Sequence, residues 1–177
     1  MSMFNGTALA LLIAVSAPAF AIESPHLGQL TSARDVAAWD ISVGPEGVGL
    51  PAGRGTAKEG EVIYSERCIA CHGVNGEGKP NDRLVGGTGT LTGLQPAVKT
   101  VGSYWPYATT LFDYVRRAMP LNEPQTLTAN EVYALSAHIL ALNGIIGPND
   151  VMDAKTLPKV KMPNHDNFFI VYPGKLE

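Results

Sequence analysis

Both cysteines of this 177-residue chain lie in one short segment, Cys68-Ile69-Ala70-Cys71-His72. The pattern C-x-x-C-H is the attachment motif for a c-type haem. Near a helix end, positions three apart lie on one side, so two sulfurs can reach the two vinyl groups of one porphyrin and form thioethers. The next residue, His72, then lies below the iron as the proximal ligand. We therefore predict one covalently attached haem c with its iron.

Three other roles for this cysteine pair have to be considered. A structural disulfide would close a very small loop. A thioredoxin-like redox pair is expected beside a βαβ pattern, which the chain does not show. A zinc site needs further cysteines or paired histidines at ligand spacing, and the sequence offers none. Haem attachment fits the motif better than any of the three.

The first 21 residues have the features of a secretory signal. An apolar run extends from Ala8 to Val15, and Ala19-Phe20-Ala21 supplies the small residues of a cleavage site. The usual Lys or Arg before the apolar run is missing, and the alternative interpretation is a buried apolar helix. No apolar run reaches the roughly 18 residues of a membrane span. We expect an exported, periplasmic protein without a membrane span, which suits a haem that bacteria attach outside the cytoplasm.

Turn-forming residues and capping motifs divide the rest of the chain. Glycine and proline crowd the second half of residues 22–55, which we interpret as an extended arm. Residues 56–144 form the predicted domain, and residues 145–177, with four prolines, form an irregular C-terminal arm. Trp39, alone in a loose segment, is expected to anchor the first arm to the domain surface or, alternatively, to a partner.

Three segments of the domain are predicted to be helices. The first and the third begin with capping boxes, Thr56 with Glu59 and Thr128 with Glu131. A proline suits the first turn of the second helix. We expect helices from Thr56 toward Cys68, from Pro106 to Arg117, and from Thr128 to Asn143-Gly144. No alternating pattern is long enough for a sheet, so the predicted fold is all-α, with three main helices around one haem.

The sixth ligand of the iron is expected to be a methionine, because a thioether favours the ferrous state. Met119 is the leading candidate, since it ends the second predicted helix and Pro120 stiffens the segment that presents its sulfur. Core packing is the alternative role for such a methionine. The other candidates are Met152, Met162, His138, His165 and an open site, with His138 expected at the surface or half-buried.

Further residues are expected around the haem. Four aromatic residues precede Met119 and would exclude water from the pocket, although core packing explains them almost as well. They are Tyr104, Trp105, Tyr107 and Phe112, of which the first two are our cofactor-binding candidates. Arg116 and Arg117 would pair with haem propionates or an acidic partner, or form a solvated helix face. A backbone carbonyl in residues 80–87 is expected to orient the ring of His72.

The charge of the chain argues against one class of partner. The net charge is −3 and the isoelectric point is near 5.8. A nucleic-acid-binding protein is expected to carry a basic patch, so we do not expect a nucleic-acid partner.

Residues 56–144 resemble a class I cytochrome c. The resemblance rests on the haem motif, the loop Asn75-Gly76-Glu77-Gly78, the Met119-Pro120 pair and the final capped helix. A narrower similarity, in residues 100–120 and in the C-terminal tail, is to the cytochrome subunits of sulfane and periplasmic sulfite dehydrogenases. In those systems a molybdenum subunit oxidises the sulfur compound and passes electrons to the haem. This chain has one haem motif, whereas the sulfane dehydrogenase cytochrome carries a second haem domain.

The resemblance implies an electron-transfer protein rather than an enzyme. The expected donor is a molybdenum-containing sulfite or sulfane dehydrogenase, and the expected acceptor is a terminal oxidase or another cytochrome. Two alternatives remain open: an electron acceptor of another periplasmic dehydrogenase, and a haem enzyme or gas sensor with a displaceable sixth ligand.

Overall fold

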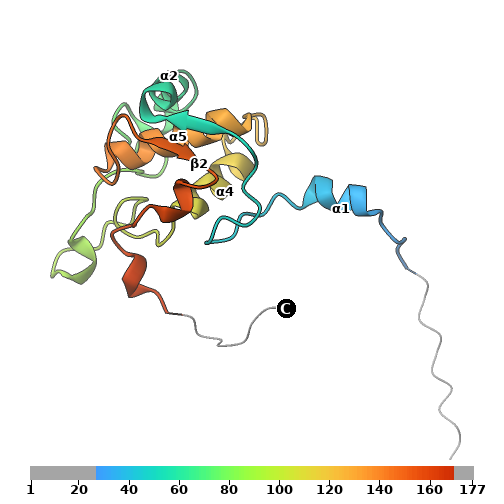
Figure 1. Cartoon of the computed structure of the whole chain (residues 1–177). Helices are drawn as coiled ribbons and strands as arrows, with labels where there is room; N and C mark the ends of the chain where they lie inside the picture. The colour runs from blue at the N-terminus through green and yellow to red at the C-terminus, as the bar shows by residue number, and fades with distance from the viewer. Residues whose placement is uncertain (1–26, 170–177) are drawn as a thin grey trace, which may run out of the picture.

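The computed structural model describes residues 27–169. The predicted signal segment, residues 1–21, and His26 lie outside this range. Within it, no helix is both long enough and apolar enough to cross a membrane. Figure 1 shows a body built around α2, α4 and α5, with the helix α1 standing apart from it.

Three long helices form the body, as the sequence predicted. They are α2 (Ala57–Arg67), α4 (Ala108–Ala118) and α5 (Ala129–Leu142). Both predicted capping boxes are present, with the threonine at the N-cap and the glutamate reaching back to it. Tyr107 is the N-cap of α4, so Pro106 precedes the helix instead of standing in its first turn, because Tyr107 still has an extended backbone. Gly144, with φ of +67°, ends α5.

The core lies where α5 crosses α2 and α4. Buried side chains along α5 contact both helices, and Phe112 of α4 packs on Tyr133 of α5 with their ring centroids 4.5 Å apart. A close approach between α2 and α5 occurs at Gly60, whose position leaves no room for a Cβ beside the backbone of Ala134. The absence of a side chain at Gly60 therefore sets the distance between the two helices.

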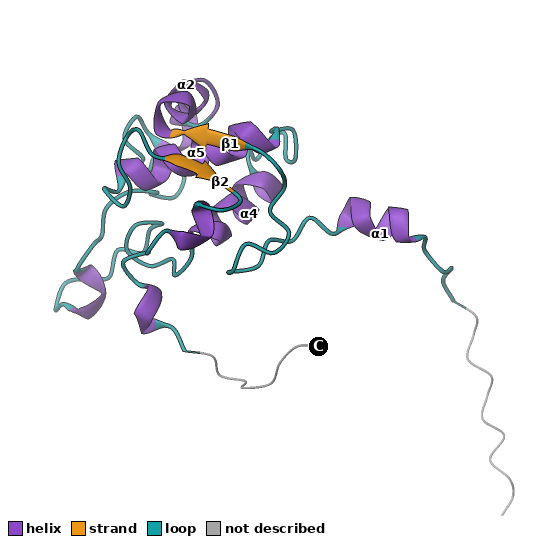
Figure 2. Ribbon diagram, viewed as in Figure 1, coloured by secondary structure: helices purple, strands orange, loops and turns teal. Residues whose placement is uncertain are grey.

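A two-stranded sheet is present that the sequence analysis did not predict. Strand β1 (Arg54–Thr56) pairs antiparallel with β2 (Val151–Asp153), with Gly55 opposite Met152 (Figure 2). Each strand has only three residues, too short for an alternating apolar pattern to be visible in the sequence. The sheet joins the segments before and after the three helices, and β1 leads directly into α2.

The irregular C-terminal segment contributes to the core. Met152, Leu157 and Met162 are almost completely buried and belong to the same apolar cluster as the helices. Two short 3₁₀ helices lie in this segment, Leu157–Lys159 and His165–Asn167, and a third, Thr90–Thr92, lies in the long loop before α4. The amide of Asn164 donates to the carbonyl of Tyr104 at 2.7 Å, which fixes the segment against that loop.

The N-terminal segment is exposed in its first part and packed against the body in its second part. Helix α1 (Ala33–Trp39) has no buried residue, and the side chain of Trp39 is 87% exposed. Trp39 therefore does not anchor the arm to the domain surface, because no other part of the described chain packs over it. The following residues do pack: the backbone N–H of Val43 donates to Asp113 at 2.9 Å, and the hydroxyl of Tyr133 donates to the carbonyl of Pro51 at 2.9 Å.

Candidate haem site

The cysteine motif occupies a sharp junction between two helices. Cys68 ends α2 and also begins the single-turn helix α3 (Ile69–His72). Its carbonyl accepts hydrogen bonds from the backbone N–H groups of Cys71 at 3.1 Å and His72 at 2.9 Å. This one helical turn places the two cysteines three positions apart on one side, as attachment to a single porphyrin requires.

Neither cysteine forms a disulfide, and both are half-buried. Burial raises the pKa of the Cys68 thiol to about 11, so this sulfur is protonated at neutral pH and lacks the low pKa of a thioredoxin-type cysteine. In residues 27–169, no group of three or more His, Cys, Asp or Glu side chains is placed to hold a metal ion. The disulfide, redox-pair and zinc alternatives therefore have no structural support.

The ring of His72 is oriented by a backbone carbonyl. Its Nδ1 lies 2.9 Å from the carbonyl oxygen of Asp82, inside the range 80–87 that the sequence indicated. A carbonyl oxygen only accepts, so Nδ1 carries the proton and Nε2 is left with its lone pair. A neutral imidazole fixed in this tautomer is suited to bind a metal through Nε2.

The loop after His72 holds that carbonyl in place. The backbone N–H of Gly78 donates to the carbonyl of His72 at 2.8 Å, and that of Asn81 donates to Cys71 at 3.0 Å. The Glu77 carboxylate accepts from the backbone N–H of Asn75 at 2.8 Å. These contacts fold the loop back on the motif, so that Asp82 returns beneath the ring of His72.

Met119 is placed differently from the two other methionines in the described part of the chain. It is the C-cap of α4, half-buried, with an extended backbone and its N–H donating to Val115 at 3.1 Å. Met152 and Met162 are enclosed in the core, with 4% and 1% exposure. Both are buried members of the apolar core cluster, whereas Met119 is partly buried and packs against that cluster.

Two comparisons with known proteins find similarity. The family model described as "Cytochrome c" matches residues 57–143. Among solved structures, the chain is similar to one in the crystal structure of the sulfane dehydrogenase SoxCD from Paracoccus pantotrophus. The identity is 38% and the TM-score is 0.76, over 85% of this chain and 73% of the other. No curated protein sequence matches significantly.

The chain belongs to the cytochrome c family. Its fold is the mainly helical cytochrome c fold, and the cofactor of the family is a covalently bound haem c with its iron. The residues of this chain fit that group: two unpaired thiols lie at one helical turn, and an imidazole follows whose Nδ1 is hydrogen-bonded to a carbonyl. The established role that follows from the family is electron transfer.

The predicted aromatic residues of this cytochrome have varied surroundings. Trp105 is half-buried against the core, and its ring meets Tyr114 edge-on at 5.8 Å. The ring of Tyr104 meets Phe168 edge-on at 5.5 Å and lies 4.8 Å from the Lys99 amine. Phe112 is fully buried in the core. Trp105 and Tyr104 therefore stay our candidates for the haem surroundings, and Phe112 has the alternative role of core packing.

The two arginines of α4 in this cytochrome bond to other groups of the protein. Arg117 forms an ion pair with Asp113 at 2.9 Å, and Arg116 donates to the carbonyl of Ile41 at 3.3 Å. Burial raises the pKa of Asp113, but hydrogen bonds from Arg117 and Val43 outweigh this and hold it below its ordinary value. Both arginines thus have partners within the protein, and their contact with haem propionates or an acidic partner stays a prediction.

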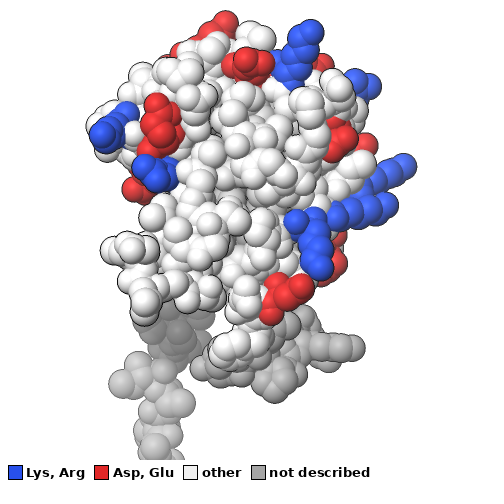
Figure 3. Space-filling model, turned by 90° about the vertical axis from the view of Figure 1, so that its left-hand side faces the viewer, with Lys and Arg blue, Asp and Glu red and all other residues white. Residues whose placement is uncertain are grey.

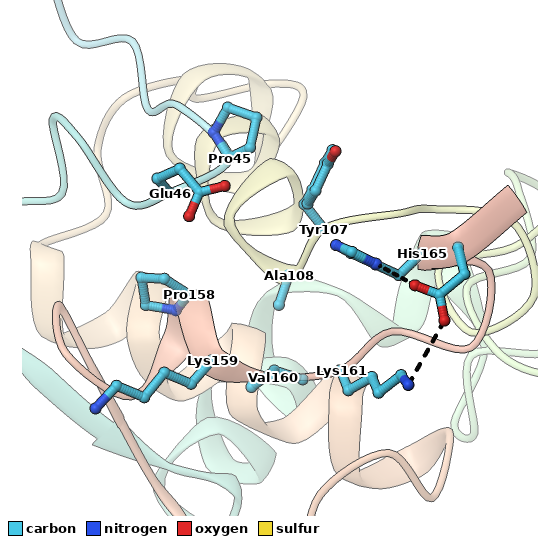
Figure 4. Close-up of a pocket in the computed structure, with 10 residues that line it drawn as sticks. Pro45, Glu46, Tyr107, Ala108, Pro158, Lys159, Val160, Lys161 and His165 are labelled. Carbon is cyan, nitrogen blue, oxygen red and sulfur yellow. Dashed lines mark hydrogen bonds and ion pairs between the residues drawn. The ribbon is translucent and has the colours of Figure 1, made fainter. Parts of the chain in front are cut away.

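The cytochrome has a pocket of about 300 Å³ (Figure 4), and no residue of the haem motif lines it. The N-terminal segment lines it with Pro45 and Glu46, the start of α4 with Tyr107, and the C-terminal segment with residues 158–161 and His165. The ring of Tyr107 meets that of His165 edge-on at 5.3 Å. Tyr107 thus belongs to the junction of the two arms and α4.

Three hydrogen bonds of the cytochrome, made by two side chains, were not predicted from the sequence, and one histidine was misplaced. His138 is buried, with 8% exposure, instead of lying at the surface or being half-buried. It lies on the face of α5 that packs against α2, where its ring centroid is 5.0 Å from that of Tyr64. Tyr64 donates to the carbonyl of Gly73, and Asn143 bonds Leu84 and Gly86. Tyr64 lies one helical turn before Cys68, and this spacing could have indicated a contact between Tyr64 and the haem motif.

Proposed function

We propose that this cytochrome accepts single electrons from a molybdenum-containing sulfite or sulfane dehydrogenase in the periplasm and passes them to a terminal oxidase or another cytochrome. The observation that carries the proposal is the extent of the similarity to the SoxCD chain. It covers 85% of this chain, whereas the cytochrome c model matches residues 57–143 alone. The similarity therefore continues into the arms, which a free electron carrier does not need.

In this proposal the chain holds the haem and breaks no substrate bond. Cys68 and Cys71 would hold the haem through thioethers, and His72 and Met119 would bind its iron. The bound haem supplies a one-electron couple. Oxidation of sulfite to sulfate by water releases two electrons and two protons. One substrate molecule at the dehydrogenase therefore reduces two monohaem chains, or one chain twice with oxidation by the acceptor in between. Tyr104 and Trp105 keep water from the haem.

The exposed helix α1 supports docking to a dehydrogenase subunit. Val36 and Trp39 lie three positions apart on one side of α1 and are 49% and 87% exposed. Tryptophan on an exposed helix is a residue type enriched at the centres of interfaces. The face of the body in Figure 3 shows both signs of charge around a largely uncharged middle, a surface without the continuous basic area of a nucleic-acid-binding protein.

Reduction of the purified holoprotein tests the proposed donor. We expect the haem to be reduced by sulfite or thiosulfate-derived sulfane sulfur only when the molybdenum dehydrogenase of the same organism is added. Alcohol with an alcohol dehydrogenase serves as the contrasting donor. If alcohol with alcohol dehydrogenase reduces the haem, and the sulfur compound with the molybdenum dehydrogenase does not, the proposed electron donor is wrong. Rapid carbon monoxide binding by the reduced protein would favour a haem enzyme or gas sensor.

Pull-down from a periplasmic extract tests the docking role of the arm. A variant that lacks residues 22–39 removes α1 but keeps the packed residues around Val43 and strand β1. We expect it to fold, to bind haem and to lose the dehydrogenase. Trp39→Ala is the milder variant, with weaker retention expected. Full retention of the dehydrogenase by the shortened chain would contradict the docking role.

A further inference from the structure

The hydroxyl of Tyr64 joins α2 to the residue that follows the proximal histidine. It donates to the carbonyl oxygen of Gly73 at 3.0 Å, and the Tyr64 side chain is 1% exposed. Gly73 comes directly after His72, so this bond holds the first peptide of the loop that leaves the haem motif. The motif itself needs no such contact, because α3 is already closed by its own backbone hydrogen bonds.

The bonded carbonyl belongs to a narrowly defined turn. It also accepts from the backbone N–H of Gly76 at 3.3 Å. Gly73 has φ of +81°, and a Cβ there would lie 2.5 Å from the Glu77 carboxylate. A turn so constrained fixes where the following residues go. It sends the chain to Asp82, whose carbonyl accepts the proton of His72 Nδ1.

The ring of Tyr64 is itself held firmly. His138 of α5 lies against it, with ring centroids 5.0 Å apart and planes at 48°. Burial is the main cause that raises the pKa of Tyr64 to about 12, with smaller contributions from Cys68 and Glu77, so the hydroxyl remains a donor throughout the physiological range. Tyr64 therefore offers a permanent, buried donor to the loop.

We propose that Tyr64 is a positioning residue that sets the orientation of the His72 imidazole on the haem iron, acting through Gly73 and the loop to Asp82. The inference rests on the proposed ligation of iron by His72. Outer partners of a ligating histidine fix its ring plane and raise its basicity. Loss of the Tyr64 hydroxyl loosens the loop, weakens the Nδ1–H bond to Asp82 and makes the imidazole a poorer donor to ferric iron.

Tyr64→Phe in the haem-loaded protein tests the proposal. We expect a changed pattern of haem methyl shifts in the proton NMR spectrum of the oxidised protein, because those shifts follow the ring plane of the axial imidazole. We also expect an upward shift in reduction potential. Neither readout needs the dehydrogenase, so failure of the proposed electron donor would leave this test unaffected.

Tyr133→Phe is the matched control. Tyr133 is also fully buried and donates one hydrogen bond to a backbone carbonyl, that of Pro51 at 2.9 Å, in the N-terminal segment instead of the haem loop. It should lose similar stability with no change in haem methyl shifts. Unchanged shifts in Tyr64→Phe, or equal changes in both variants, would overturn the proposal.

A second substitution covers the case in which Tyr64→Phe does not take up haem. Site-specific 3-fluorotyrosine at position 64 keeps the ring and hydroxyl but makes the hydroxyl a stronger donor. We expect the potential to move downward, opposite to the effect of losing the hydroxyl. An unchanged potential and an unchanged shift pattern would show that the hydroxyl does not influence the histidine.

Discussion

Gly60 of α2 lies directly against the backbone of Ala134 of α5, where a Cβ would overlap the Ala134 carbonyl. The contact brings together the helix that carries the haem motif at its end and the helix that forms the centre of the core. A single glycine thus controls how closely the haem motif is held to the body of the protein.

Gly60→Ala is expected to destabilise the protein. In an isolated helix alanine would be favoured by about 1 kcal/mol over glycine. Here the backbone of Ala134 cannot move aside without separating the helices, and overpacking of this kind costs about 1–3 kcal/mol or more. Denaturant unfolding of the holoprotein measures the difference. Gly93→Ala is the control, because no atom lies nearer than 3.8 Å to its added Cβ; equal stability of the two variants would contradict the prediction.

His138 makes stability depend on pH in the mildly acidic range. Burial lowers its pKa from 6.5, against smaller raising effects of the Glu61 charge and a backbone hydrogen bond of Ala57. As the pH falls through 6.5, His138 is protonated in the unfolded chain before it is protonated in the folded protein. The free energy of unfolding is therefore highest above pH 6.5 and decreases until the pH reaches the lower pKa of the folded state. Melting temperatures of wild type and His138→Leu, measured from pH 7.5 to pH 5, should diverge, with the wild type falling more steeply. Parallel curves would exclude His138 as the source.

Met119→Ala tests the proposed sixth ligand. We expect loss of the far-red charge-transfer band of the oxidised protein, a lower reduction potential and carbon monoxide binding in the reduced form, since a thioether stabilises ferrous iron. Met162→Leu is the comparison, because Met162 is buried in the core and a swap of similar volume costs less than about 1.5 kcal/mol. Should the band persist without Met119 and vanish without Met162, the two assignments must be exchanged.

Asn143 connects the end of α5 to the loop beyond the haem motif. Its amide donates to the carbonyls of Leu84 at 3.2 Å and Ile139 at 2.9 Å, and its oxygen accepts from the N–H of Gly86 at 3.1 Å. Asn143→Ala removes this partner from the Leu84 carbonyl and the Gly86 N–H, a loss of about 1–3 kcal/mol, whereas the Ile139 carbonyl keeps the bond from the Asn143 backbone N–H. The free energy of opening at the Gly86 amide, measured by hydrogen exchange, should decrease by a similar amount, so that this amide exchanges faster. Unchanged exchange there would show that the side chain does not hold the loop.

Local chemistry explains which features were predictable. The haem motif, the two capping boxes and the half-buried Met119 at the end of α4 depend on residues within a few positions of each other. Trp39 was misjudged because its exposure depends on what else packs nearby. His138 was misjudged because only the crossing of α2 and α5 determines which face of α5 is covered.

The sequence alone determined the C-x-x-C-H motif, which is contiguous in the chain, and the positions of the three long helices, two of which begin with capping hydrogen bonds between near neighbours. Tertiary structure decided the pairing of β1 with β2, the burial of Met152 and Met162, and the meeting of His72 with Asp82 and of Tyr64 with Gly73. These contacts form between segments that only the folded loops and crossed helices bring together, and short strands or single carbonyls leave no periodic pattern that would reveal their partners.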